Sequence, residues 1–170
     1  GYGEDRDGGW AYIIMEFVEG DNLEQTLTRV DDQGLQYQGQ PMMAETAVSY
    51  GISLCKVLEY LAARTDPRTG QPTPIIHHDI KPANIILDAN SGQVRLVDFG
   101  TAKLRVSALA VPTGMKQSSV YGTEGYAPPE QYSGKSQPRS DVYAVAATLY
   151  HLLTDDDPRD HSFDFLPGLA

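Results

Sequence analysis

The sequence predicts an α+β domain that is mainly helical. Residues 44–63 place apolar side chains at helical spacing, which indicates an amphipathic helix. Residues 142–153 are apolar nearly all the way round, which predicts a second helix buried in the middle of the domain. Between them, the apolar runs 84–88 and 93–98 flank a four-residue turn that includes Gly92, and this pattern predicts a β-hairpin.

Shorter elements precede these. Residues 10–18 are rich in aromatic and β-branched side chains and predict a buried strand. Asn22 is placed to cap a short helix from residue 23 to about residue 29, and residues 31–40 predict a surface loop. Residues 101–139 show no sustained period, and so long a segment in a compact domain is either disordered or functional.

Composition excludes several classes of protein. Hydrophobic residues make up 41% of the 170 residues and charged residues 21%, as in a globular domain and unlike a disordered or collagen-like chain. The single cysteine, Cys55, rules out an internal disulfide, and its place on the helical apolar stripe predicts a small buried core residue. With neither a membrane-spanning apolar run nor a secretion signal in the sequence, we expect a cytoplasmic location, which leaves room for a membrane anchor outside this segment.

Charge is unevenly distributed along the chain. The 13 basic and 23 acidic residues give a net charge of −10, which disfavours nucleic acid as a partner. Residues 1–40 hold two basic and nine acidic residues, whereas residues 81–139 hold seven basic and four acidic ones. The middle segment either meets phosphate or is ordinary solvated surface, and charge alone leaves both interpretations open.

The densest chemistry lies in residues 77–84, His-His-Asp-Ile-Lys-Pro-Ala-Asn, followed by Asp98-Phe99-Gly100. Asp79 stands in a loop where it would accept a proton from an incoming hydroxyl. Asn84 and Asp98 fall at the inner ends of the two hairpin strands, and such a pair of oxygen ligands, with room for water and phosphates, suits Mg²⁺. Lys81 places a cation where phosphoryl charge would develop.

These residues resemble the catalytic loop and magnesium motif of the eukaryotic-type Ser/Thr protein kinases. Residues 122–130, Gly-Thr-Glu-Gly-Tyr-Ala-Pro-Pro-Glu, resemble the end of the activation segment of that family. Ser140-Asp141 resembles the start of the central buried helix, whose Asp braces the catalytic loop. Several such motifs in the expected order make the match specific, and the residues within them resemble those of bacterial members of the family.

The resemblance implies a protein-kinase-like C-terminal lobe in residues 21–170, with a residual N-lobe strand and hinge in residues 1–20. The implied reaction transfers the γ-phosphoryl group of ATP, with Mg²⁺, to a Ser or Thr hydroxyl of a protein. Asp79 is then the catalytic base and Lys81 the phosphate-contacting lysine.

The same resemblance assigns the binding residues. It makes Asn84 and Asp98 the magnesium ligands. Met15 becomes the gatekeeper, and Glu16 and Val18 contact adenine through their backbones. Thr123, together with Lys81, is typical of Ser/Thr rather than tyrosine kinases and lies in the segment that meets the substrate residue after the acceptor.

The sequence departs from the family in two ways. The glycine-rich loop and the strand lysine that holds the nucleotide phosphates have no counterpart, since the first lysine is Lys56. We therefore expect a partial kinase domain, short at both ends, that is nearly inactive alone. His78 stands where many members have an arginine that grips a phosphorylated loop residue, so phosphorylation would lack its usual anchor. The candidate phosphosites are Thr113, Ser118, Ser119 and Tyr121.

Two alternative functions remain. In the first alternative, the chain is a non-catalytic, kinase-like binding or scaffold module. The retention of Asp79, Lys81, Asn84 and Asp98 disfavours this alternative. A small-molecule phosphotransferase of related fold shares the Asp-x-x-x-x-Asn loop, but the Pro-Glu of the activation segment and Lys81 disfavour it. The sequence does not predict the oligomeric state.

Overall fold

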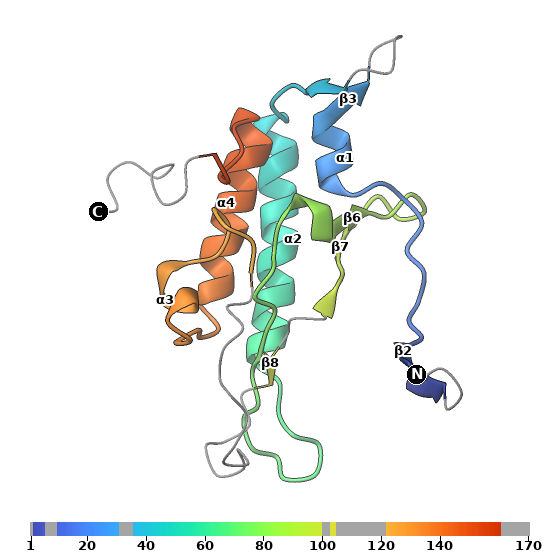
Figure 1. Ribbon diagram of the computed structural model, residues 1–170, viewed down its shortest axis with the longest axis vertical. Coiled ribbons are helices and arrows are strands. Elements are labelled where there is room, and N and C mark those ends of the chain that lie inside the picture. The colour runs from blue at the N-terminus through green and yellow to red at the C-terminus, as the bar shows by residue number, and fades with distance from the viewer. Residues whose placement is uncertain (1, 6–9, 31–35, 100–102, 105–121, 161–170) are drawn as a thin grey trace.

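The computed structural model describes residues 2–5, 10–30, 36–99, 103–104 and 122–160. Two long helices, α2 (Ala44–Ala62) and α4 (Ser140–Thr154), lie side by side at its centre, as Figure 1 shows. Both helices confirm the sequence prediction closely. The described residues also form three short helices: α1 (Leu23–Leu27), the 3-10 helix η1 (Pro82–Asn84) and α3 (Pro129–Tyr132).

The strands form small antiparallel pairs rather than one sheet. The predicted hairpin is confirmed, because β6 (Ile85–Leu87) pairs with β7 (Val94–Leu96). The described residues contain three further pairs: β1 (Tyr2–Asp5) with β2 (Trp10–Ile13), β3 (Thr28–Val30) with β4 (Gln36–Gln38), and β5 (Ile75–Ile76) with β8 (Lys103–Leu104).

The core lies where α2 meets α4. One stripe of α2 is buried at helical spacing and includes Leu54 and Leu58. Gly51 on this stripe allows close approach, since a Cβ there would lie 2.8 Å from the Cδ1 atom of Leu149. The buried apolar cluster joins both helices to α1 and the hairpin; its members are Leu23, Leu27, Leu54, Leu58, Leu61, Ile80, Ile85, Val94, Ala144, Val145 and Leu152.

Helix α1 begins at the predicted cap. The backbone N–H of Gln25 donates to Oδ1 of Asn22 (2.8 Å), and the backbone N–H of Asn22 donates to Oε1 of Gln25 (2.9 Å), which is a reciprocal capping box. The helix ends at Leu27 rather than near residue 29, because residues 28–30 pair with 36–38. The predicted loop over 31–40 therefore contains a strand.

The predicted buried strand over residues 10–18 is wrong beyond Ile13. Its partner strand pairs Tyr2 with Ile13, so the ladder of hydrogen bonds ends there. The next side chains are open to solvent: Met15 is 68% exposed and Phe17 87% exposed. The segment then returns to the hairpin, where Gly20 passes so close that a Cβ would lie 2.0 Å from the carbonyl oxygen of Leu87.

Two burial predictions also need correction. Cys55 is exposed, because the buried stripe of α2 runs through Leu54 and Leu58 and Cys55 lies one residue further round the helix. Helix α4 is not buried all round, since Val142 and Leu153 are 52% and 39% exposed. No helix in the described part of the chain is long and apolar enough to cross a membrane.

Candidate active site

The first turn of α4 holds the loop over residues 77–84 through hydrogen bonds to its backbone. The carboxylate of Asp141 accepts hydrogen bonds from two successive backbone N–H groups, of His77 to Oδ2 (2.8 Å) and of His78 to Oδ1 (3.0 Å). Burial raises the pKa of Asp141, and the two N–H donors lower it part of the way back. The bracing role that the resemblance gives Asp141 is therefore present.

Asp79 lies at the centre of a compact hydrogen-bond network. Its Oδ1 accepts from the hydroxyl of Thr123 (2.7 Å), and its Oδ2 accepts from Nδ2 of Asn84 (2.9 Å) and pairs with Nζ of Lys81 (3.1 Å). The ammonium of Lys81 also donates to the Thr123 hydroxyl (2.7 Å). Lys81 and Asn84 of the same loop and Thr123 of the distant 122–130 segment thus all contact Asp79.

The network keeps Asp79 ionised. Burial by itself would raise the pKa of this carboxyl group. The hydrogen bonds from Thr123 and Lys81, the positive charge of Lys81 and the Asn84 amide act in the opposite direction and outweigh burial, so the pKa of Asp79 lies below its ordinary value. Asp79 is a carboxylate at neutral pH, which is the form able to accept a proton.

The hairpin places Asn84 and Asp98 on adjacent backbone. Helix η1 leads directly into β6, and the backbone N–H of Val97 donates to the carbonyl of Asn84 (2.9 Å), which extends the pairing to the residue before Asp98. The Asn84 Nδ2 atom is engaged by the backbone carbonyl and carboxylate of Asp79, so its amide oxygen is the atom suited to a metal. Asp98 has a left-handed backbone, with φ of 61°, and is exposed.

This donor set fits magnesium. An amide oxygen and one carboxylate leave room for phosphate oxygens and water, which Mg²⁺ prefers to an all-protein cage. Within the described residues no group of three or more His, Cys, Asp or Glu side chains is placed to hold a metal by itself.

His77 belongs to the same site but has no role in the sequence prediction. It is fully buried, its Nδ1 accepts from the backbone N–H of Asp79 (3.3 Å), and its Nε2 therefore donates to the carbonyl of Val97 (3.0 Å). Its ring packs edge-on against the ring of Phe99, with the two ring centroids 4.7 Å apart. Burial lowers the pKa of His77, so this neutral ring ties the catalytic loop to the segment that carries Asp98.

The predicted adenine contacts lie in a different segment of the chain from this network and are more exposed to solvent. Met15 and Glu16 are exposed and Val18 is half-buried, in the extended segment that leads to Gly20. Their roles stay predictions. The candidate phosphosites Thr113, Ser118, Ser119 and Tyr121 lie outside the described residues.

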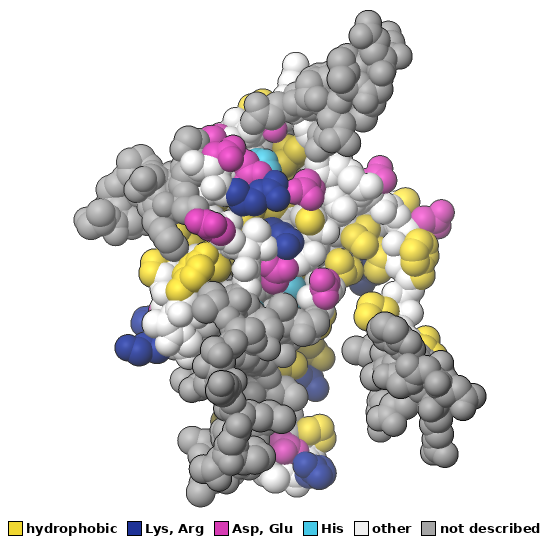
Figure 2. Space-filling view, viewed as in Figure 1, with side chains coloured by type: hydrophobic (Ala, Val, Ile, Leu, Met, Phe, Trp, Pro, Cys, Tyr) yellow, Lys and Arg dark blue, Asp and Glu magenta, His cyan; other side chains and the backbone are white. Residues whose placement is uncertain are grey.

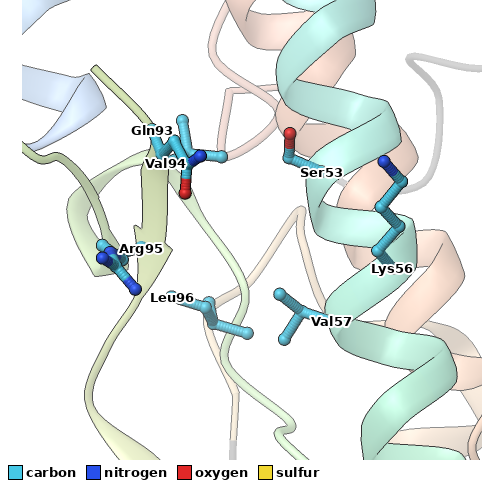
Figure 3. Close-up of a pocket in the computed structure, with 7 residues that line it drawn as sticks. All are labelled: Ser53, Lys56, Val57, Gln93, Val94, Arg95 and Leu96. Carbon is cyan, nitrogen blue, oxygen red and sulfur yellow. The ribbon is translucent and has the colours of Figure 1, made fainter. Parts of the chain in front are cut away.

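Charges and hollows on the surface give two further observations. On the face shown in Figure 2, acidic side chains lie beside basic ones. The ion pairs of the described residues include Lys81 with Asp79 and Arg159 with Glu24. A separate open pocket of about 430 Å³ lies between α2 and β7 (Figure 3). Because none of the predicted site residues lines it, this pocket is distinct from the Asp79 network; its lining consists of Ser53, Lys56, Val57, Gln93, Val94, Arg95 and Leu96.

Comparison with known proteins decides the family. The family described as "Protein kinase domain" matches residues 4–164. The chain belongs to the protein kinase family. This confirms the resemblance on which the site residues were chosen, and the helix-rich fold with small antiparallel strand pairs agrees with it.

Bacterial Ser/Thr kinases are among the relatives of this kinase domain. It is 36% identical to serine/threonine-protein kinase PknA of Nostoc sp. over 151 residues, which is 88% of this chain and 23% of that protein. It is 35% identical to PknL of Mycobacterium tuberculosis over 158 residues, 92% of this chain and 34% of the relative. With PknB of Mycobacterium leprae it shares 33% identity over 160 residues, 93% of this chain and 22% of that protein. The chain thus spans between 22% and 34% of the length of these relatives.

Proposed function

We propose that the protein containing these residues is a Ser/Thr protein kinase, which transfers the γ-phosphoryl group of ATP to a Ser or Thr hydroxyl of a protein substrate. The observation that carries this proposal is the Asp79 carboxylate, held ionised and bonded to Lys81, Asn84 and Thr123 in a loop braced by α4. Phosphoryl transfer depends mainly on positioning and on stabilising charge, and this network supplies both.

Each polar side chain has a task in this proposal. Asp79 orients the acceptor hydroxyl and takes its proton. Lys81, already within 3.1 Å of Asp79, offsets the negative charge that develops on the transferring group. Asn84 and Asp98 would hold Mg²⁺, which when bound neutralises charge on the nucleotide phosphates. Thr123 bonds both Asp79 and Lys81 and so sets where the acceptor approaches.

The remaining predictions concern the nucleotide and the setting. We assign the adenine contacts to Met15, Glu16 and Val18, and residues 21–170 to the larger lobe. Residues 1–55 contain no lysine, so none of them places an ammonium group on the ATP phosphates. We expect the domain to work in the cytoplasm, where ATP is supplied.

A phosphotransfer assay with labelled ATP tests the function. The full-length protein should phosphorylate a protein substrate or itself, and Asp79→Asn should lower kcat by about 10²- to 10⁴-fold, the usual contribution of a general base. The 170-residue chain alone should stay near background, because the phosphate-gripping lysine is missing. Asp66→Asn, at a partly exposed carboxylate outside the network, serves as the matched control.

Three outcomes contradict the proposal. Undiminished activity of a folded Asp79→Asn variant overturns the assignment of the base. No transfer by the folded full-length protein favours a scaffold module. Transfer to an aminoglycoside or choline, but not to protein, indicates a small-molecule phosphotransferase instead.

A further inference from the structure

The backbone of His78 adopts a conformation that needs support. Its φ is 72°, in the left-handed region that residues with a Cβ rarely adopt. His78 is buried and directly precedes Asp79, so its conformation sets the direction in which the Asp79 side chain leaves the loop. A conformation of this kind persists where the surrounding contacts determine it.

Two buried side chains hold His78, one at each of its backbone polar groups. Its N–H donates to Oδ1 of Asp141 (3.0 Å), as the family resemblance implies. Its carbonyl accepts a hydrogen bond from Nε2 of Gln131 (2.7 Å), which lies in the short helix α3. Gln131 is only 5% exposed, so water has little access to take its place. The sequence patterns gave Gln131 no role.

Gln131 also contacts the segment that carries Thr123. A Cβ at Gly122 would lie 2.2 Å from the Gln131 Nε2 atom and 3.0 Å from the His78 carbonyl oxygen. The Gln131 amide therefore occupies the space that the missing side chain of Gly122 leaves open. Gly122 has a φ of 122°, which other residues rarely adopt.

The two backbone positions that meet at Gln131 each precede a residue of the site. His78 precedes Asp79 and Gly122 precedes Thr123, and Asp79 and Thr123 are themselves joined by a 2.7 Å hydrogen bond. Movement of the Gln131 amide would shift both partners of that bond. A displacement of about 1 Å at a catalytic group can lower the reaction rate about 100-fold.

We propose that Gln131 is a positioning residue for phosphotransfer, whose side-chain amide holds the His78 carbonyl beside Gly122 and thereby aligns Asp79 with Thr123. The proposal rests on the kinase activity proposed above. It requires a hydrogen-bond donor at the end of the side chain, not merely a side chain of this size.

Two substitutions in the full-length protein separate the donor from the volume. Gln131→Met keeps a similar size and removes the donor, and we expect kcat to fall about 10- to 100-fold while KM for ATP changes less than twofold. Gln131→Glu places a carboxylate against the carbonyl at pH 8, but burial raises the pKa of such a group, and its protonated form can donate. The ratio of Gln131→Glu to wild-type kcat should therefore recover several-fold between pH 8 and pH 6.

Gln71→Glu, at an exposed position in the loop before β5, is the matched control and should follow the wild type at both pH values. Folding is checked by thermal unfolding. A wild type without phosphotransfer would refute the proposed function. Folded Gln131 variants with wild-type kcat, a Gln131→Glu ratio that does not change with pH, or variants that all fail to fold would instead refute the positioning role.

Discussion

Thr123 gives the Asp79 carboxylate a hydrogen bond of 2.7 Å and accepts one of the same length from Lys81. Both bonds go through one hydroxyl oxygen, so this atom helps to fix the distance between the Asp79 carboxylate and the Lys81 ammonium. The order of the chain does not suggest this contact, since Thr123 lies 44 positions after Asp79. Motif spacing did predict the identity of both residues, because each belongs to its own short pattern.

Thr123→Val should lower kcat about 10- to 100-fold, because the side chain keeps its shape and loses both hydrogen bonds. The hydroxyl lowers the pKa of Asp79, so its loss raises that pKa and moves the acid limb of the pH–rate profile to higher pH. Steady-state kinetics across pH measures both effects. Thr123→Ser keeps the hydroxyl and should restore most of the rate; an equal loss in both variants would contradict this role.

At the scale of elements, the close contact of α2 with α4 depends on Gly51. Gly51→Ile would push a branched side chain against Leu149, whose Cδ1 atom lies 2.8 Å from an ideal Cβ. We expect the free energy of unfolding to fall by about 1–3 kcal/mol, as in other overpacked cores. Urea unfolding measures the change. Ser49→Ile, exposed on the same helix, is the control and should cost under about 1 kcal/mol; equal losses would show that Gly51 has no special packing role.

The cap of α1 provides a second prediction at this scale. Asn22→Ala removes the acceptor for the Gln25 N–H and should lower the free energy of unfolding by about 0.5–2 kcal/mol. Asn22→Asp keeps an acceptor at the helix N-terminus and should lose much less. Asn22 also forms an isolated β-bridge with Ile86. Comparison of the two variants by urea unfolding separates the loss of the cap from any effect of substitution on this bridge.

Helix α4 contacts the catalytic loop, the segment that follows Thr123 and the residues before α2. Its first turn holds the catalytic loop through Asp141, and the carbonyl of Leu152 accepts from the backbone N–H of Met42 before α2 (2.7 Å). Near its end, Nδ1 of His151 forms a 2.6 Å hydrogen bond with the hydroxyl of Tyr126, three residues after Thr123. Both segments of the site are therefore fixed to the same helix.

This arrangement predicts how stability depends on pH. Burial lowers the pKa of both His77 and His151, so the unfolded chain binds more protons than the folded one once the pH falls below the ordinary histidine value of 6.5. Stability should be constant with respect to these groups above about pH 7 and should fall as the pH is lowered from 6.5. Asp79, with its lowered pKa, adds a further loss only at pH values below its ordinary 3.8.

His151→Asn tests the histidine contribution. The Asn side-chain amide can donate to or accept from the Tyr126 hydroxyl, but it does not titrate, so the loss of stability between pH 7.5 and 5.5 should be smaller than in the wild type. Urea midpoints at several pH values measure it. Contributions from groups such as Asp141 are common to both proteins and cancel in the comparison. An unchanged pH dependence would show that His151 is already protonated or accessible in the folded chain.

Sequence alone predicted the two long helices, the hairpin and the kinase family, because helical period, turn residues and motif spacing are local properties. It also singled out Asp79, Lys81, Asn84 and Thr123, which the structure brings together and whose roles stay predictions. Local pattern could not show that Cys55 faces solvent, since that depends on which side of α2 meets α4. Nor could it show that Gln131 reaches the carbonyl of His78, 53 positions earlier. That contact exists only because α3, Gly122 and the catalytic loop pack together, and only the tertiary structure decides such packing.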